Sequence, residues 1–187
     1  MTAVWGSTFV LIKDVVARMP VADFLAARFL IAAIVMLALF GRQVVALGRL
    51  QIVRGLLLGC IYGMGQLLQT WGLSLIAPSV SGFATGMYVV FTPILAMLLL
   101  RQRLAGVVWL AVLLATAGLA LLSLNGVSVD RGVWLTLASA VLYALHIVGL
   151  GQWSRKGEAF GLSAVQMVAI AIVCLLSTLP HGPTLPP

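Results

Sequence analysis

Long apolar segments alternate with short polar ones along the chain. Each apolar segment is roughly 17 to 22 residues long, and a helix of about 20 apolar residues spans the hydrocarbon core of a bilayer. The pattern therefore predicts seven transmembrane helices, at residues 1–17, 24–40, 55–75, 80–100, 104–124, 132–153 and 162–179.

Segments of this length favour helices over the strands of a membrane barrel, which alternate apolar and polar residues in units of about ten. The composition agrees, because 63% of the residues are hydrophobic and only 8% are charged. A soluble domain needs about a quarter of its residues charged. We predict an all-α membrane protein, a polytopic helical bundle whose main partner is the lipid bilayer.

A row of polar side chains interrupts the third predicted helix. Tyr62, Gln66 and Gln69 follow one another at i, i+4 and i+7, so a helix places them on one stripe. An unpaired amide or hydroxyl in hydrocarbon costs several kcal/mol. The stripe should therefore face other helices or water.

Small residues and one proline mark two further features of the predicted helices. The pairs Gly59–Gly63 and Gly82–Gly86 have the GxxxG spacing that lets a second helix approach closely. Pro93 removes the donor for the carbonyl four residues earlier and predicts a kink in the fourth helix. Such a kink suits a cavity wall or a gate.

The basic residues indicate the orientation of the chain. The net charge is +7, but the basic residues lie at the ends of apolar segments and form no stripe with interleaved aromatics, so we expect no nucleic-acid partner. Alternating the seven helices gives one side more Lys and Arg, and that side is expected to be cytoplasmic. The N-terminus is then cytoplasmic. The richer side carries Arg42, Arg49, Arg54, Arg101, Arg103, Arg155 and Lys156, and the other side Lys13, Arg18, Arg28 and Arg131.

No motif in the sequence indicates an enzyme, a metal or a cofactor. Cys60 and Cys174 lie inside apolar segments without the spacing of a zinc site. GxSxG, HExxH and P-loop motifs are absent, as is a pair of aspartates at membrane depth. We therefore predict that the chain is not an enzyme.

A weak internal repeat has an offset of 138 residues, which carries Trp5 onto Tyr143 and Thr8 onto His146. The offset holds five helices, an odd number, so the second copy would enter the membrane from the opposite face. We expect an inverted five-helix repeat with an incomplete second copy. The predicted parts are a first repeat at 1–124, a connecting loop at 125–131, the first two helices of a second repeat at 132–179 and a disordered, proline-rich tail at 180–187.

Three stretches of the chain resemble the EamA-like family of the drug/metabolite transporter superfamily. They are WGSTFVLIK at 5–13 with ARFLIAA at 27–33, APSVSGFATGMYVVFTPILAMLLLRQRL at 77–104, and ATAGLALLSL at 115–124. The resemblance implies two inverted five-helix repeats, truncated here after about seven of ten helices, and export of metabolites or drug-like solutes from a bacterial cytoplasmic membrane. Protons are a candidate coupling ion. One departure is Gln102, which stands where the family usually has an acidic residue.

For a transporter, the candidate solute-path residues are the polar and aromatic ones at membrane depth. The alternative for each is an interhelical hydrogen bond worth about 0.6 kcal/mol. His146 could relay protons, because imidazole titrates near neutral pH, or pack as a neutral side chain. The candidates are Trp5, Ser7, Thr8, Tyr62, Gln66, Gln69, Thr70, Tyr88, Tyr143 and His146.

Arg28, one turn inside the second predicted helix, also has two interpretations. It could reach the headgroups or pair with Asp23, or it could contact an anionic solute at a cavity mouth.

Two functions remain open at this point. The chain is either a secondary carrier or a truncated, non-transporting remnant that needs another chain to complete its cavity. In the second repeat, the helix that corresponds to the third predicted helix would lie beyond residue 187. We therefore expect the chain alone not to transport. The solute and the oligomeric state are not determined by the sequence.

Overall fold

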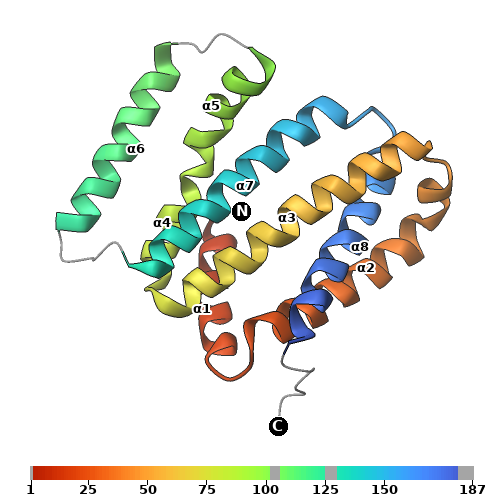
Figure 1. The fold of residues 1–187 in the computed structure, drawn as a ribbon, viewed down its shortest axis with the longest axis horizontal. Coiled ribbons are helices and arrows are strands. Elements are labelled where there is room, and N and C mark those ends of the chain that lie inside the picture. The colour runs from red at the N-terminus through yellow and green to blue at the C-terminus, as the bar shows by residue number, and fades with distance from the viewer. Residues whose placement is uncertain (1, 102–105, 125–129, 181–187) are drawn as a thin grey trace. The chain divides into compact units, whose positions relative to one another are not determined.

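A computed structural model describes residues 2–101, 106–124 and 130–180, and within these residues all regular structure is helical (Figure 1). Residues 181–187 of the predicted tail, Gln102 and most of the predicted loop at 125–131 lie outside the described residues. The helices are α1 (Thr2–Val16), α2 (Val21–Val45), α3 (Arg49–Leu75), α4 (Pro78–Gly86), α5 (Tyr88–Leu100), α6 (Gly106–Leu124), α7 (Arg131–Trp153) and α8 (Ala159–Thr178).

The predicted fold class is confirmed. Five helical segments are long and apolar enough to cross a membrane: α2, α3, α4 with α5 taken together, α7 and α8. The other two predicted spans correspond to α1, with 15 residues, and to α6, whose stretch Gly106–Gly118 is apolar. The chain is an all-α, multi-pass membrane protein.

Several helices extend beyond the predicted apolar segments. Helix α2 begins at Val21 rather than at residue 24, and α3 begins at Arg49 rather than at residue 55. Hydropathy marks only the part of a helix that crosses hydrocarbon, whereas good helix formers such as Arg, Leu and Gln continue the helix into the headgroup region. The prediction was therefore too short at these ends.

The fourth predicted span is interrupted at Met87, so it forms two helices rather than one. The Met87 N–H donates to the carbonyl of Ala84 at 3.3 Å, and the Met87 carbonyl accepts from Val90 at 2.9 Å. These i to i+3 bonds tighten the backbone locally into a 3₁₀ turn. Pro93 lies inside α5, six residues further on.

The contacts between residues divide the chain into two compact units. Unit 1 contains residues 1–14 and 68–148, and unit 2 contains residues 15–67 and 149–187. Helices α3 and α7 each contribute residues to both units. This division by contacts differs from the division into sequence repeats, which stays a prediction.

In unit 2, α2 packs against α8 (Figure 1). The core includes Phe29 and Ala33 of α2 with Ile170 and Cys174 of α8. At the other end of the pair, Phe40 stacks on Phe160 with ring centroids 4.8 Å apart. Early residues of α2 thus meet late residues of α8, so the two helices are antiparallel.

Glycines allow α3 to approach α8 closely within unit 2. A Cβ atom built on Gly55 would lie 2.8 Å from Val165, and one on Gly59 would lie 2.6 Å from the carbonyl oxygen of Gln166. A Cβ on Gly63 would lie 3.2 Å from Val173. The three glycines occur at i, i+4 and i+8 and form one continuous seam, which we call the α3–α8 glycine seam.

Unit 1 combines most of α1 and the end of α3 with α4, α5, α6 and most of α7. Met87, Val90 and Ala140 form its buried apolar cluster. The backbone of α3 meets α7 at Gly72, where an added Cβ would lie 2.3 Å from Thr136 Oγ1. Buried small residues therefore set the spacing of this helix pair.

Two pairs of helix ends lie close to the offset of the predicted repeat. Helices α2 and α8 begin at Val21 and Ala159, which are 138 positions apart, and α1 and α7 end at Val16 and Trp153, which are 137 positions apart. The inverted repeat itself stays a prediction.

The α3–α8 glycine seam yields a stability prediction. Gly59→Ala should destabilise the protein by about 1–3 kcal/mol, because the new methyl group meets backbone atoms of α8 that cannot rotate away. The matched control is Gly82→Ala, since a Cβ on Gly82 meets no described atom within 4 Å. Unfolding of the purified chain in mixed micelles measures both; equal stability of the two variants would contradict the seam.

Candidate functional site

A hydrogen-bonded network of three side chains joins three helices of unit 1. Tyr143 of α7 donates from its hydroxyl to Gln69 Oε1 of α3 at 2.7 Å. Gln69 donates in turn from Nε2 to Thr85 Oγ1 of α4 at 3.0 Å. We call these three residues the Gln69 network.

All three members of the Gln69 network are buried, with 9% of Gln69, 1% of Thr85 and 6% of Tyr143 exposed. Leaving one buried partner unsatisfied costs about 1–3 kcal/mol, so each side chain depends on the others. An amide can both donate and accept, which lets Gln69 occupy the centre of the network.

Ser81 adds an unused polar atom on the same face of α4. It precedes Thr85 by one helical turn and is fully buried. Among the residues that the structure describes, its Oγ has no hydrogen-bond partner. A buried hydroxyl of this kind is suited to a bound water or to a polar atom of a ligand.

Other buried hydroxyls in unit 1 are satisfied by their own helix. Thr136 Oγ1 donates to the carbonyl of Gly132 at 2.8 Å, and Ser139 Oγ donates to the carbonyl of Thr136 at 2.6 Å. Back-bonding of this type lets Ser and Thr lie in an apolar helix without an outside partner. These two residues are structural rather than candidate ligands.

The predicted stripe on α3 is divided between the two units. Tyr62 and Gln66 belong to unit 2, where Gln66 Nε2 donates to the Tyr62 hydroxyl at 3.0 Å, whereas Gln69 belongs to unit 1. The i, i+4 spacing that predicted a shared face thus produces a direct hydrogen bond along the helix.

The remaining path candidates are distributed over unit 1. Thr70 is buried on α3, while Thr8, Tyr88 and His146 are partly buried on α1, α5 and α7. Trp5 and Ser7 lie on α1, but their side chains lie outside the described part of the structure.

The other predicted site residues have the following surroundings. Arg28 is exposed on α2, with its guanidinium 5.3 Å from the centre of the Phe29 ring. Gly59 and Gly63 belong to the α3–α8 glycine seam. A Cβ on Gly82 or Gly86 would meet none of the described atoms within 4 Å, so the second GxxxG pair differs from the first.

Lys13, which the sequence analysis used only to assign the orientation, binds the end of another helix. Its Nζ donates to three backbone carbonyls at the end of α3, those of Leu73 at 2.8 Å, Ser74 at 3.1 Å and Ile76 at 2.7 Å. The last carbonyls of a helix lack partners within the helix and carry partial negative charge. Lys13 of α1 therefore caps α3.

Sequence reasoning missed Thr85 and Ser81 as partners of the predicted stripe. A signal was present, because the two hydroxyls are four residues apart in an otherwise apolar segment and so share a helix face. It is a weak signal, since Ser and Thr also satisfy themselves by back-bonding.

The fold and the Gln69 network define an integral membrane protein with a buried, uncharged polar centre. A model of the EamA-like transporter family matches residues 1–124, which is more than half of the chain. The chain belongs to the EamA-like transporter family. Comparisons with curated proteins and with solved structures gave no match.

Membership confirms the family predicted from the sequence. The chain is a membrane transporter of the drug/metabolite type, in a family of transporters rather than of enzymes, and its partners are the lipid bilayer and small solutes. Among the described residues, no group of three or more His, Cys, Asp or Glu side chains could hold a metal ion.

The Gln69 network yields a prediction about coupled side chains. Tyr143→Phe and Gln69→Leu should each destabilise the protein, but the double variant should lose less than the sum of the two effects. The difference should be about 0.6 kcal/mol, the average for hydrogen bonds between transmembrane helices. Unfolding by SDS titration in mixed micelles gives the three free energies.

The control for this cycle pairs Gln69→Leu with Thr116→Val. Thr116 bonds only along its own helix, donating to the carbonyl of Val112 at 2.8 Å, so these two effects should add. Additive effects of the Tyr143 and Gln69 variants would show that their hydrogen bond does not couple α3 to α7.

Proposed function

We propose that the chain forms part of a secondary carrier that exports small metabolites or drug-like solutes across a bacterial cytoplasmic membrane, with the N-terminus in the cytoplasm. The Gln69 network is the observation that carries this proposal. It places donors and acceptors at membrane depth in a family of transporters, with the hydroxyl of Ser81 as a further polar atom.

The chemistry of the network suits an uncharged solute. Its members are an amide, a phenol and a hydroxyl, which offer hydrogen-bond donors and acceptors rather than an ionic partner. A solute with its own donor or acceptor can replace the Tyr143 or Thr85 partner of Gln69, so that binding exchanges one hydrogen bond for another. Such exchange loosens the link between α3, α4 and α7 without leaving a buried group unpaired.

We further propose that His146 couples transport to protons. It lies on α7 nearly one turn after Tyr143, which places the two side chains on neighbouring positions of the helix. Imidazole gains a proton between about pH 6 and 7, the range in which a proton gradient acts. The predicted anion contact at Arg28, on α2 of unit 2, stays a separate proposal that applies only to solutes with an anionic group.

The alternative function is a non-transporting remnant or assembly partner. The spacing of the helix ends supports the view that α7 and α8 are the first two helices of a second, inverted repeat. On that plan the cavity needs three more helices, supplied by residues beyond 187 or by another chain. The same polar network would then bind a solute without transporting it across the membrane.

Solute binding tests the proposed site directly. A screen of uncharged metabolites and drug-like amides or phenols should find compounds that raise the melting temperature of the purified chain, because a ligand stabilises the state that it binds. Gln69→Leu should abolish the increase, and Thr116→Val, on the exposed face of α6, should retain it. Equal shifts in both variants would place binding elsewhere.

Flux assays separate the two candidate functions. We expect liposomes that contain only residues 1–187 to show no solute flux, because half of the cavity is missing on the repeat plan; flux from this chain alone would contradict that plan. Where flux is restored by the completing helices, His146→Gln should remove its dependence on a pH gradient while leaving solute binding intact. Unchanged proton-driven flux would exclude the relay.

A further inference from the structure

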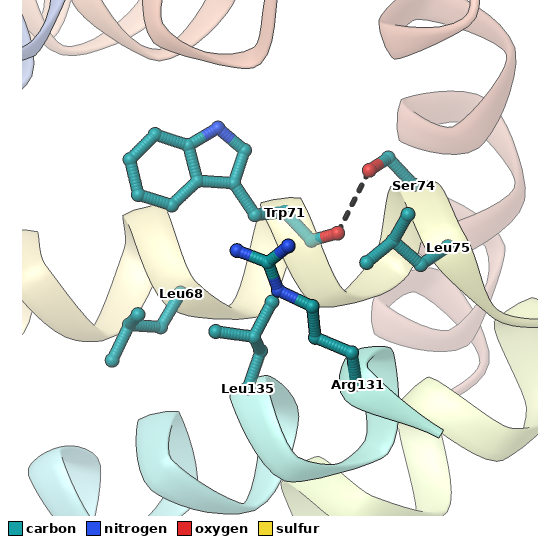
Figure 2. A pocket seen from close by; sticks show the side chains of 6 residues that line it. All are labelled: Leu68, Trp71, Ser74, Leu75, Arg131 and Leu135. Carbon is teal, nitrogen blue, oxygen red and sulfur yellow. Dashed lines mark hydrogen bonds between the residues drawn. The ribbon is translucent and has the colours of Figure 1, made fainter.

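A cleft of about 410 Å³ lies on the outside of unit 1, between the end of α3 and the start of α7. Figure 2 shows its lining, which comes from one apolar and one polar set of side chains. The apolar set is Leu68, Leu75 and Leu135. The polar and amphipathic set is Trp71, Ser74 and Arg131.

Arg131 is the only charged side chain that lines this cleft. In Figure 2 it extends from α7 toward α3, and its guanidinium group is drawn near Trp71. Among the described residues, the structure contains no hydrogen bond, ion pair or cation–π contact to this guanidinium. Asp130, the preceding residue, does not line the cleft.

The electrostatic field at the cleft is further shaped by Lys13. The carbonyls at the end of α3 would repel an anion, but the Lys13 ammonium group binds those of Leu73, Ser74 and Ile76. Because Lys13 neutralises the helix end, Arg131 adds a net positive charge beside it. Asp130 carries the opposite charge but does not line the cleft, so the charge that the cleft presents to a ligand is the positive one of Arg131.

The position of the cleft indicates the kind of anion. It lies where α3 ends at Leu75 and α7 begins at Arg131, which is the depth of the headgroups for helices that cross the bilayer. Trp71 is 40% exposed, and tryptophan is enriched at the membrane interface. Leu75 is 59% exposed and offers an apolar surface to lipid.

We propose that this cleft binds a single anionic phospholipid. The phosphate accepts hydrogen bonds from the Arg131 guanidinium, whose planar donors fit phosphate oxygens. One acyl chain lies against the three leucines, and the Trp71 ring covers the glycerol region. The lipid joins α3 to α7 at the membrane interface, outside the Gln69 network.

The test is a titration of the purified full chain with phosphatidylglycerol and, separately, with phosphatidylcholine, followed by native mass spectrometry. We expect one phosphatidylglycerol to be retained in preference to phosphatidylcholine. Arg131→Gln should raise the dissociation constant of phosphatidylglycerol about fivefold, the factor that corresponds to about 1 kcal/mol for one basic residue near an anionic headgroup. Leu135→Trp, which fills the cleft without changing charge, should also remove the bound lipid.

The matched control is Arg18→Gln, an exposed arginine of unit 2 on the same proposed side of the membrane. It loses the same charge and should retain the bound lipid. Equal losses in Arg18→Gln and Arg131→Gln would overturn the proposal in favour of diffuse attraction. Equal retention of the two lipids would also overturn it, as would a melting-temperature increase with glycerol 3-phosphate alone, which would identify a soluble anion instead.

Discussion

A polar group at membrane depth has to find its partner inside the protein, because lipid offers no hydrogen bonds. Each buried polar feature of this chain follows from that constraint. Gln69 satisfies Tyr143 and Thr85 on two other helices, and Thr136 bonds to its own backbone. Ser81 is the exception among the described residues, and for that reason it is chemically informative.

Helix α3 shows how the same constraint organises the packing. Apolar side chains gain little from meeting one another in lipid, so transmembrane helices associate through close contact and shared hydrogen bonds. Within unit 2 its glycines bring it against α8, and within unit 1 Gly72 brings it against α7. The close approach at Gly72 and the hydrogen bond from Tyr143 to Gln69 join the same two helices, so packing and polar pairing support each other.

The sequence predicted the helical segments well because hydropathy over about 20 residues reports directly on a bilayer span. It also predicted the polarity of the stripe, since periodicity depends only on neighbours along one helix. Thr85 and the role of Lys13 were missed because their partners are distant in sequence, Lys13 being 60 residues from Leu73. The break at Met87 was missed because Gly86 beside it was interpreted as half of a GxxxG packing pair, and because the proline lies six residues later, inside α5.

The hydrogen bonds from Lys13 hold part of α1 to the end of α3 within unit 1. If α1 separated from the end of α3, three carbonyls and an ammonium group would lose their partners near the membrane interface. The end of α1 and the end of α3 should therefore move as one body. The tight turn at Met87 joins two helices that make different contacts. Thr85, before the turn, belongs to the Gln69 network, whereas Val90, after it, belongs to the apolar cluster. A change of angle at Met87 can shift Thr85 relative to Gln69 while α1 and α3 stay together. The kink or gate at Pro93 stays a prediction, and the interruption that the structure shows lies six residues before it, at Met87.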